Sequence, residues 1–449
     1  MNREILNREQ MQRIAERALS FSTADEARVH ITAGRQGNTR FAVNQITTGG
    51  DVHNVAVVVT SAFGRRVASA STNGVSDESL RTVVATSERL ARLVPENPEY
   101  MGELGPQRYT ERSSLVEATA ALTADERARA VNRVTGPAAE RGLVSTGFLP
   151  HSATASAVAT SRGLFAHTTG SRVSFTTTVR TPDGSGSGWA GSGSHDWADL
   201  DVPQIAERAI EKAERSRKPR DVEPGRWTVI LEPTAAANMM NLMMNALDAR
   251  LADEGRSFFS RAGGGNRIGD RFVDARVTIW SDPEDPRLYS APFNGEGLPN
   301  RRTVWVEAGT LRNLEYTRYW ASRQKRETAG FVSGWYMEGG NADLDDLIRS
   351  TKRGLLLTRL WYIRSVDPRT ILFTGLTRDG TFLIENGRIA YAVKNLRWNE
   401  SPVLMLKNLE LLGEPTRVVT GESGDSPNTV FVPPMKIRNF TFTSVSDAV

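Results

Sequence analysis

Cysteine is absent from the 449-residue sequence, and histidine occurs only five times. The lack of cysteine excludes disulfide bonds, thiolate zinc sites and cysteine nucleophiles. All five histidines lie in the first half of the chain: His30, His53, His151, His167 and His195. A hydrolytic zinc centre normally takes three protein ligands, chiefly histidine and cysteine with help from carboxylates. The second half could offer carboxylates alone, and we expect each isolated histidine to be an ordinary core or surface residue.

Long apolar runs are missing as well. The longest candidates, "VAVVV" at 55–59 and "LLLTRLWYI" at 355–363, have the length of strands and fall short of the roughly 18 residues that a membrane span requires. The opening "MNREILNREQMQRIAERAL" is charged and helical in period, without the apolar segment of a secretion signal. We therefore expect a cytoplasmic protein that has no membrane partner.

Charge of one sign does not dominate either, because 56 lysines and arginines face 52 aspartates and glutamates. Bases alternate with acids in stretches such as "AERAIEKAERSR" at 206–217, which is typical of solvated helix faces. A nucleic-acid surface usually needs a clustered basic stripe. The composition, 39% hydrophobic and 24% charged, is that of a soluble globular protein, and we do not expect nucleic-acid binding.

Several catalytic signatures are also absent. The chain has no G-x-S-x-G elbow, no P-loop lysine and no H-E-x-x-H. The run "GGGNRIG" at 263–269 has the wrong spacing for a dinucleotide fingerprint and follows a predicted helix instead of opening one. It predicts a tight glycine turn.

The length of the chain indicates two domains, because 449 residues are more than one hydrophobic core usually contains. The best boundary is "RKPRDVEPGR" at 217–226, with two prolines, a glycine and mixed charge, and we divide the chain into 1–222 and 223–449. The first part mixes strand-like runs with amphipathic helices, and Thr123 with Glu126 forms a capping-box pattern. The second part is almost wholly strand and turn. We predict an α+β protein with a mixed N-terminal domain and a mainly antiparallel, barrel-like C-terminal domain that carries one long helix.

The stretch "DGSGSGWAGSGSHDW" at 183–197 has the composition of a flexible linker. Its two tryptophans favour a different interpretation, because a free linker seldom keeps large aromatic side chains. We predict a Gly/Ser-rich strand pair whose small residues allow close approach of backbone or ligand.

The long helix of the second part is predicted over 235–254, with Thr234 as its cap and Gly255 at its end. One apolar stripe follows helical spacing and predicts burial against a sheet: Met240, Met243, Met244, Leu247 and Leu251. A less apolar face carries Asn241, Asn245, Asp248 and Ala252. This face is either the polar boundary of an amphipathic helix or a binding face, and the residues alone leave both open.

Segments spread over the whole chain together resemble the TldD/PmbA family, whose older description is modulator of DNA gyrase. The first half contributes "TRFAVNQITT" and "DGSGSGW" before a helix. The second half contributes "DEGRSFFS", "GEGLPNRRTVWVEAGTL", "DGTFLIENGRI" and the late "MKIRNFTFT". Each motif is modest, and their order and spacing together are fairly specific.

In the active member of that family, a zinc peptidase, the helix carries H-E-x-x-G-H before a G-x-S-x-F-S segment. Aligning that segment with 255–260 places Met240 at the first histidine, Asn241 at the general-base glutamate and Asn245 at the second histidine. The third ligand, a late cysteine, would fall within 417–425, where this chain has none. The resemblance implies a PmbA/TldE-like chain without a zinc site of its own, in which a regular helix simply buries Met240.

The resemblance further implies a non-catalytic subunit that pairs with a TldD-like catalytic chain and shapes a cavity for unfolded peptides. We expect no cofactor in this chain and zinc in the partner, and Asp248, Arg256 and Ser257 are candidates for lining the cavity. Two alternatives remain: a stand-alone homo-oligomeric peptide-binding protein, and a metal-independent hydrolase built on carboxylates such as Asp248, Asp253 and Glu254.

Overall fold

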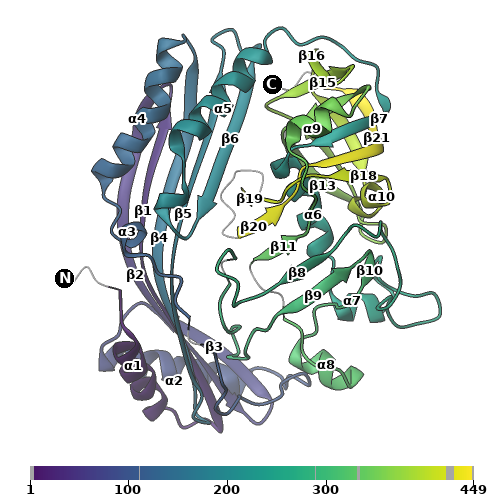
Figure 1. The fold of residues 1–449 in the computed structure, drawn as a ribbon. Coiled ribbons are helices and arrows are strands. Elements are labelled where there is room, and N and C mark those ends of the chain that lie inside the picture. The colour runs from purple at the N-terminus through teal and green to yellow at the C-terminus, as the bar shows by residue number, and fades with distance from the viewer. Residues whose placement is uncertain (1–4, 111, 289, 331–333, 421–428, 447–449) are drawn as a thin grey trace.

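The computed structural model describes residues 5–110, 112–288, 290–330, 334–420 and 429–446. It is 24% helix and 41% strand, which confirms the predicted α+β class. An N-terminal sheet with its helices stands beside a C-terminal body made mostly of strands (Figure 1). Among the described helices none is both long enough and apolar enough to cross a membrane.

The N-terminal region is one six-stranded antiparallel sheet in the order β3-β2-β1-β4-β5-β6. Its strands are β1 (Glu26–Ala42), β2 (Gln45–Phe63), β3 (Arg66–Thr72), β4 (Val144–Thr160), β5 (Phe165–Arg180) and β6 (Ser187–Ser194). Its helices are α1 (Arg8–Ser20), α2 (Asp77–Leu93), α3 (Glu117–Ala120), α4 (Ala124–Glu140), the 3-10 turn η1 (Trp197–Asp199) and α5 (Val202–Arg215).

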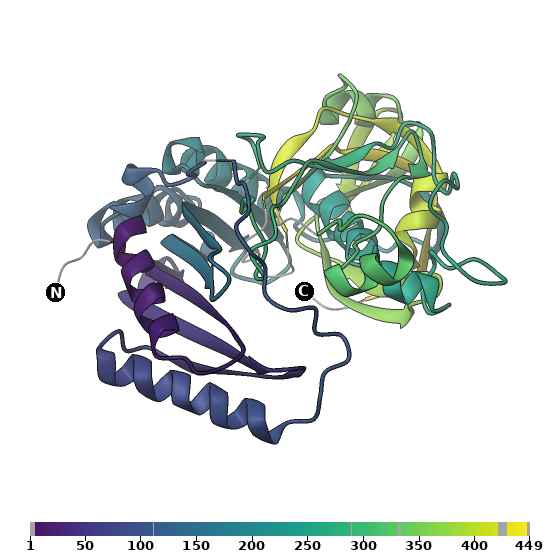
Figure 2. The same cartoon turned by 90° about the horizontal axis from the view of Figure 1, so that it is seen from below.

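The four long helices cover one face of this sheet. Strand residues alternate between faces, and the apolar side chains of β1 and β4 that the helices bury are odd-numbered, such as Val29, Ile31 and Ala157. Val158 points to the other face and is buried against Phe293 of the C-terminal region. Helices α1 and α2 pack on one end of that face, and α4 and α5 on the other, where Phe41 and Phe175 form a second apolar cluster. Figure 2 shows α1 and α2 on the side of the sheet away from the C-terminal body. The opposite face of the sheet is therefore free to meet that body.

Local capping contacts position these helices, and the one at Thr123 is the capping box that the sequence predicts. Thr123 and Glu126 form the capping box of α4, with the Glu126 amide donating to the Thr123 hydroxyl at 3.3 Å and the Thr123 amide donating to the Glu126 carboxylate at 2.8 Å. Asp201 caps α5 by accepting from the Gln204 amide at 3.0 Å. Both caps satisfy amides that a helix start otherwise leaves without partners.

The Gly/Ser-rich stretch at 183–197 is not a linker. It forms a turn and then the edge strand β6, so the preference for strand over linker is confirmed, although β6 pairs with β5 and not within the stretch. A Cβ atom on Gly188 would lie 2.2 Å from the carbonyl oxygen of Ala209 on α5. Glycine is required there because the strand lies directly against the helix backbone.

The C-terminal region contains two sheets, in the orders β10-β9-β8-β11-β20-β19 and β13-β14-β17-β21-β7-β12-β15-β16, with β18 paired to β21. The strands of the first are β8 (Ile279–Ser281), β9 (Thr303–Glu307), β10 (Thr310–Leu311), β11 (Trp335–Met337), β19 (Thr416–Val419) and β20 (Thr429–Val432). Those of the second are β7 (Gly225–Leu231), β12 (Arg353–Leu357), β13 (Leu360–Asp367), β14 (Leu372–Thr377), β15 (Thr381–Glu385), β16 (Arg388–Ala392), β17 (Leu396–Glu400), β18 (Leu409–Leu412) and β21 (Met435–Val445).

Both C-terminal sheets are open, and no closed barrel forms in the described part of the chain. Most pairs are antiparallel, as predicted, but β7 with β12 and β11 with β20 are parallel. The helices of this region are α6 (Pro233–Met244), α7 (Ala249–Asp253), α8 (Arg318–Gln324), α9 (Leu344–Arg349) and α10 (Pro402–Lys407). The predicted boundary between residues 222 and 223 falls in the segment that joins α5 to β7.

The prediction of one helix over 235–254 is wrong, because the chain forms two helices, α6 and α7, with a break between them. In the break the Leu247 carbonyl accepts from the Glu315 amide at 2.6 Å, and the Ala249 amide donates to the Glu315 carbonyl at 3.1 Å. Asp248 then caps α7 by accepting from the Leu251 amide at 2.8 Å. The start also differs, since Glu232 and not Thr234 is the cap residue of α6.

The glycine run after α7 is the turn that the sequence predicts. Gly263, Gly264 and Gly265 have φ values of 91°, 109° and 76°, which residues with a Cβ rarely adopt. A bridge between Ser260 and Asn266 closes the turn.

Candidate functional site

Helix α6 holds the position that the resemblance gives to a metal-binding helix, and its methionines are core residues. Met240 and Met243 are completely buried and Met244 is 1% exposed. They belong to the largest apolar cluster of the protein, where α6 contacts α10, β7, β19 and β20. Leu247 of the predicted stripe is buried too, whereas Leu251 is partly exposed. The side chain at the first-ligand position therefore fills the core.

Asn241 and Asn245 lie on the other side of α6. Asn241 is partly exposed, and Asn245, the C-terminal cap residue of the helix, is exposed. Neither side-chain amide has a hydrogen bond to another described residue, although the Asn245 backbone amide donates to the Asn241 carbonyl at 2.9 Å. Their amides can therefore bond to solvent or to a second molecule.

Asn238 lies on the same face of α6 as Asn241 and Asn245, and it was not singled out from the sequence. It is 5% exposed, and its side-chain oxygen has no hydrogen-bond partner among the described residues. The sequence alone could have indicated this row of asparagines, because spacings of three and four residues place Asn238, Asn241 and Asn245 on one helix face. A buried amide oxygen of this kind usually has a partner, so the row is the most distinctive polar feature of α6.

The three residues predicted to line a cavity make local contacts. Asp248 caps α7, as described above. Arg256 is exposed and forms an ion pair with Glu254. The Ser257 hydroxyl accepts from the Phe259 amide at 3.2 Å. Asp248 lies before α7, and Arg256 and Ser257 lie in the loop after it. Their lining of a peptide cavity stays a prediction.

The carboxylates proposed for a metal-independent hydrolase are each engaged in structural contacts. Asp253 accepts from the Asn266 side-chain amide and from the Trp320 indole, both at 2.7 Å. Glu254 pairs with Arg250 at 3.0 Å and with Arg256, and these arginines lower its pKa. These contacts hold the carboxylates in the fold of the loop.

The third ligand position falls at the end of β19. Residues 421–425 of the predicted segment lie outside the described residues, and Val418 to Thr420 are buried. Thr420 is completely buried, and its hydroxyl has no hydrogen-bond partner among the described residues. Among all the residues that the structure describes, no three histidine, aspartate or glutamate side chains gather closely enough to hold a metal ion.

The histidines stand apart from α6, in the N-terminal sheet and its loops. Burial is the largest cause of a lowered pKa for His30, His151, His167 and His195. His30 bonds to the Ser156 hydroxyl at 3.0 Å, and the Nδ1 atom of His151 lies 3.4 Å from Arg127. His151 is buried, His30, His167 and His195 are partly buried, and His53 is exposed, so the five histidines are spread between core and surface.

A cavity of about 610 Å³ opens where α6 begins, between the N-terminal and C-terminal regions. Its lining includes Lys212 from α5, Glu232 and Thr234 from the start of α6, and Arg417 from β19. Lys212 and Glu232 form an ion pair of 2.6 Å across it, and Arg417 reaches back to Asp199. The start of α6 is thus exposed to a polar space between the two regions.

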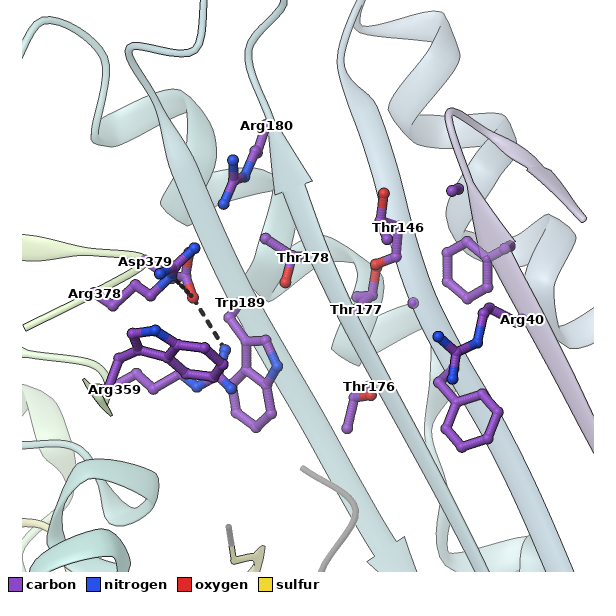
Figure 3. A pocket seen from close by; sticks show the side chains of 15 residues that line it. Arg40, Thr146, Thr176, Thr177, Thr178, Arg180, Trp189, Arg359, Arg378 and Asp379 are labelled. Atoms are coloured by element: carbon purple, nitrogen blue, oxygen red, sulfur yellow. Dashed lines mark hydrogen bonds and ion pairs between the residues drawn. The ribbon is translucent and has the colours of Figure 1, made fainter. Parts of the chain in front are cut away.

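A second space, a groove of about 530 Å³, lies between the helix-free face of the N-terminal sheet and the β13–β14 pair. Figure 3 shows its side chains, with threonines in the middle and arginines and aromatic rings around them. On the C-terminal side, Arg359 pairs with Asp379 at 3.0 Å. Asp379 also accepts from the Ser187 hydroxyl of β6 at 2.6 Å, which joins the two walls.

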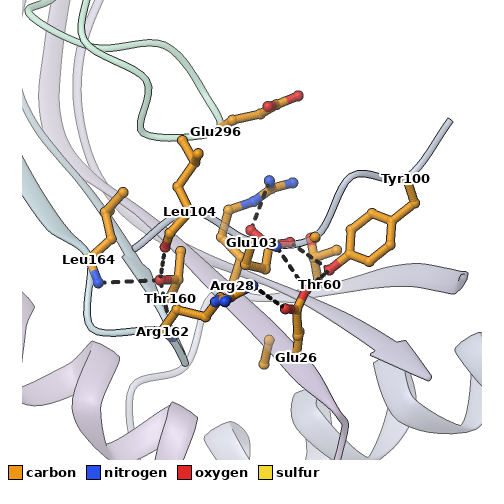
Figure 4. A network of polar contacts seen from close by, with 12 residues as sticks. Glu26, Arg28, Thr60, Tyr100, Glu103, Leu104, Thr160, Arg162, Leu164 and Glu296 are labelled. Carbon is orange, nitrogen blue, oxygen red and sulfur yellow. Dashed lines mark hydrogen bonds and ion pairs between the residues drawn. The ribbon is translucent and has the colours of Figure 1, made fainter. Parts of the chain in front are cut away.

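A third connection between the regions is the extended segment 97–105, which follows α2 (Figure 4). Glu26 of β1 accepts from the Tyr100 hydroxyl and from the Glu103 amide, both at 2.8 Å. From the C-terminal region, Arg318 donates to the Gly102 carbonyl at 3.1 Å. Glu103 is 4% exposed, and burial raises its pKa although Arg28 lies 3.2 Å away. The segment ties the sheet to the C-terminal body.

Comparison with known families gives two adjoining matches. The family model described as PmbA/TldA metallopeptidase central domain matches residues 104–217, and the one described as PmbA/TldA metallopeptidase C-terminal domain matches residues 224–444. Together they cover three quarters of the chain, including both sides of the segment between α5 and β7.

Curated relatives agree with these matches at low identity. The chain is 26% identical over 261 residues to a metalloprotease of Methanothermobacter thermautotrophicus, covering 53% of this chain and 55% of that protein. It is 22% identical over 247 residues to the metalloprotease PmbA of Escherichia coli O157:H7, covering 54% and 52%. The chain thus spans about half the length of these curated relatives.

A solved structure matches nearly the whole fold. TldE from Thermococcus kodakarensis superposes with a TM-score of 0.83 over 96% of this chain and 99% of that chain, at 17% identity. The likeness establishes a common fold for the two chains.

Proposed function

Since this chain belongs to the PmbA/TldD metallopeptidase family, we propose that it is a non-catalytic subunit of a TldD/TldE-type zinc peptidase complex. It pairs in the cytoplasm with a TldD-like catalytic chain and shapes the cavity that admits unfolded peptides. The zinc belongs to the partner, where it supplies polarisation of the scissile carbonyl and activation of water. This chain contributes walls, entry and substrate contacts.

The main support for the proposal is the burial of Met240 and the early end of α6. Met240, at the position of the first ligand, is completely buried among apolar side chains, and α6 ends at Met244, one residue before Asn245. A metal ligand needs a side chain with a free electron pair directed at an open site, whereas this helix directs a thioether into the core. Asn241 replaces the general base with an amide, which does not take up a proton at neutral pH.

Substrate contacts come from the polar surfaces between the two regions. β19 contacts α6 and is the edge strand of its sheet among the described strands. An edge strand can pair with an extended peptide through main-chain hydrogen bonds, independently of peptide sequence. An unfolded chain fits such an edge, whereas a folded protein offers no extended segment to it.

The test is co-expression of this chain with a chain that carries H-E-x-x-G-H and a late cysteine. We expect the two to co-purify, zinc to be present at one atom per pair, and cleavage of an unfolded peptide to stop when a chelator removes the zinc. Stoichiometric zinc and hydrolysis by this chain alone would overturn the proposal.

A homo-oligomeric peptide-binding protein is the second candidate, because the groove between the sheet and β13–β14 is completed by one chain. Native mass measurement separates the two ideas. A stable assembly of this chain that binds peptide and ignores a co-expressed TldD-like chain would favour the second.

A further inference from the structure

The groove between the N-terminal sheet and the β13–β14 pair is rich in arginine. Its lining holds four arginines, Arg40, Arg180, Arg359 and Arg378, against one aspartate, Asp379. Asp379 is 3% exposed and is neutralised by Arg359 at 3.0 Å, with Arg378 a further neighbour at 3.8 Å. The groove therefore carries an excess of positive charge in a space of about 530 Å³.

Arg40 and Arg180 lie on the side of the groove that the N-terminal sheet forms, the sheet wall, and neither is paired with a carboxylate among the described residues. The guanidinium of Arg40 lies 5.0 Å from the ring of Phe148, and Arg180 is partly buried. Neither forms an ion pair with any described residue. Arg40 is exposed, whereas Arg180 is partly removed from water. An arginine that is partly removed from water usually pairs with a carboxylate or phosphate, so Arg180 points to a missing anion and Arg40 adds positive charge to the same wall.

The register of the strands fixes how the wall is laid out. Arg40, Phe148 and Thr176 stand opposite one another on β1, β4 and β5, and Thr178 stands opposite Trp189 on β6. From β1 to β6 is three strand spacings, or about 14 Å. That width corresponds to about four residues of extended peptide at roughly 3.3 Å each. Figure 3 shows the threonines between Arg40 and Trp189. Thr176 and Thr178 share one face of β5, whereas the Thr177 hydroxyl donates to the Thr146 carbonyl at 3.2 Å.

The opposite wall is held rigidly. Arg359 lies between two indole rings, 4.5 Å from the ring centre of Trp189 and 5.2 Å from that of Trp361. Arg378 lies 4.8 Å from the centre of Trp361. Because these guanidinium groups already cover the indole faces, a nucleic-acid base has no free ring on which to stack. The aromatic edges still offer apolar contact to peptide side chains.

We propose that this groove is a carboxylate-binding site for extended peptides, in which Arg40 and Arg180 hold the carboxylate. The planar guanidinium fork pairs with a carboxylate through two parallel hydrogen bonds, and the threonine hydroxyls add further donors. The carboxylate comes from the peptide C-terminus or from an aspartate or glutamate side chain. The site lies away from α6 and adds a preference for acidic or C-terminal segments that main-chain pairing at a sheet edge does not supply.

The experiment measures binding of fluorescein-labelled octapeptides to the purified full chain by fluorescence anisotropy at low salt. One peptide has a free C-terminus and neutral side chains, a second is amidated and carries two internal glutamates, and a third is amidated with glutamines in their place. We expect the third to bind about tenfold or more weakly than the better of the other two. The first two together tell which source of carboxylate the site prefers.

Variants locate the site. Arg40→Gln and Arg180→Gln are each expected to weaken binding of the preferred peptide about tenfold, and Arg→Lys at either position to weaken it less, because lysine keeps the charge and loses the fork. Arg133→Gln is the matched control: Arg133 is exposed on α4, over the other face of the sheet. Arg40 and Arg180 are not core residues, and thermal unfolding checks that each variant is folded.

Three results would overturn the proposal: equal binding of the glutamine peptide, unchanged binding by the Arg40→Gln/Arg180→Gln double variant, or an equal loss in Arg133→Gln. Tighter binding of a single-stranded oligonucleotide than of either acidic peptide would overturn it as well. Since the measurement uses this chain alone and no zinc, its outcome is independent of whether a catalytic partner co-purifies.

Discussion

Lys212 on α5 and Glu232 at the start of α6 form an ion pair of 2.6 Å that joins the N-terminal and C-terminal regions. Their side chains are 18% and 15% exposed, so the pair is largely shielded from water. Glu232 occupies the cap position of α6 without capping it through its side chain, which is committed to Lys212.

Replacing Lys212 with methionine is expected to destabilise the protein by about 2 kcal/mol, because Glu232 remains as a shielded charge without its partner. Urea denaturation measures the change. The Lys212→Met/Glu232→Gln double variant should recover part of the loss. Arg141→Gln is the control, since its pair with Glu207 is well exposed and is worth less than about 1 kcal/mol; equal losses in both would show that shielding is not the cause.

Met240→Ala is expected to cost about 2–5 kcal/mol, the range for removing a buried side chain of this size from a tight core. Asn245→Ala should change stability by less than about 0.5 kcal/mol, because the side chain is exposed and makes no hydrogen bond to a described residue. Thermal unfolding of both variants tests the core role of Met240. A small effect of Met240→Ala would contradict that role.

His151 is expected to lower stability in weak acid. It is 3% exposed, and burial together with Arg127 lowers its pKa to about 4. The unfolded chain, with a histidine pKa near about 6.5, then binds the proton more readily than the folded protein. The stability that the buried neutral ring of His151 provides is therefore fully present above about pH 6.5. It is lost as the pH falls toward about 4, by up to roughly 1.4 kcal/mol per pH unit.

Two measurements check the prediction for His151. An NMR titration should place the pKa of its ring near about 4. The stability difference between the wild type and His151→Asn should change between about pH 6.5 and pH 4. His53→Asn, at an exposed strand position, is the matched control. A flat difference for His151→Asn across that range would be inconsistent with the lowered pKa.

Glu26→Ala is expected to loosen segment 97–105. The carboxylate accepts hydrogen bonds from Tyr100, from the Glu103 amide and from Arg162. Its loss leaves the first two without that partner, at a cost of about 1–3 kcal/mol, and should make the segment more sensitive to limited proteolysis. Glu16→Ala removes a single surface contact, to Gln12, and should leave the cleavage pattern unchanged.

Local sequence was enough to predict amphipathic helices in the N-terminal region. The capping box at Thr123 and the cap at Asp201 act within four residues, so no tertiary information is needed to find them. The strand character of β6 was readable from its tryptophan, because a packed aromatic side chain needs a fixed backbone. The α+β class follows from these local patterns.

The break between α6 and α7 was beyond local reasoning. An aspartate at position 248 suits both the polar face of a long helix and the cap of a new one, and the Glu315 backbone decides between them from 67 positions away. The arginine-lined groove could not be predicted from local sequence for the same reason. Alternation places Arg40 and Arg180 on one face, but only the folded chain brings Arg359 and Asp379 opposite them.

The long strands of the N-terminal sheet have a consequence for how the region unfolds. β1 and β4 each run for 17 residues, about 55 Å. Each supplies one apolar cluster near one end and a second cluster near the other, as β1 does with Ile31 and Phe41. Neither cluster can melt without fraying strands that hold the other in register. Two spatially separate cores should therefore be lost in a single cooperative transition on heating.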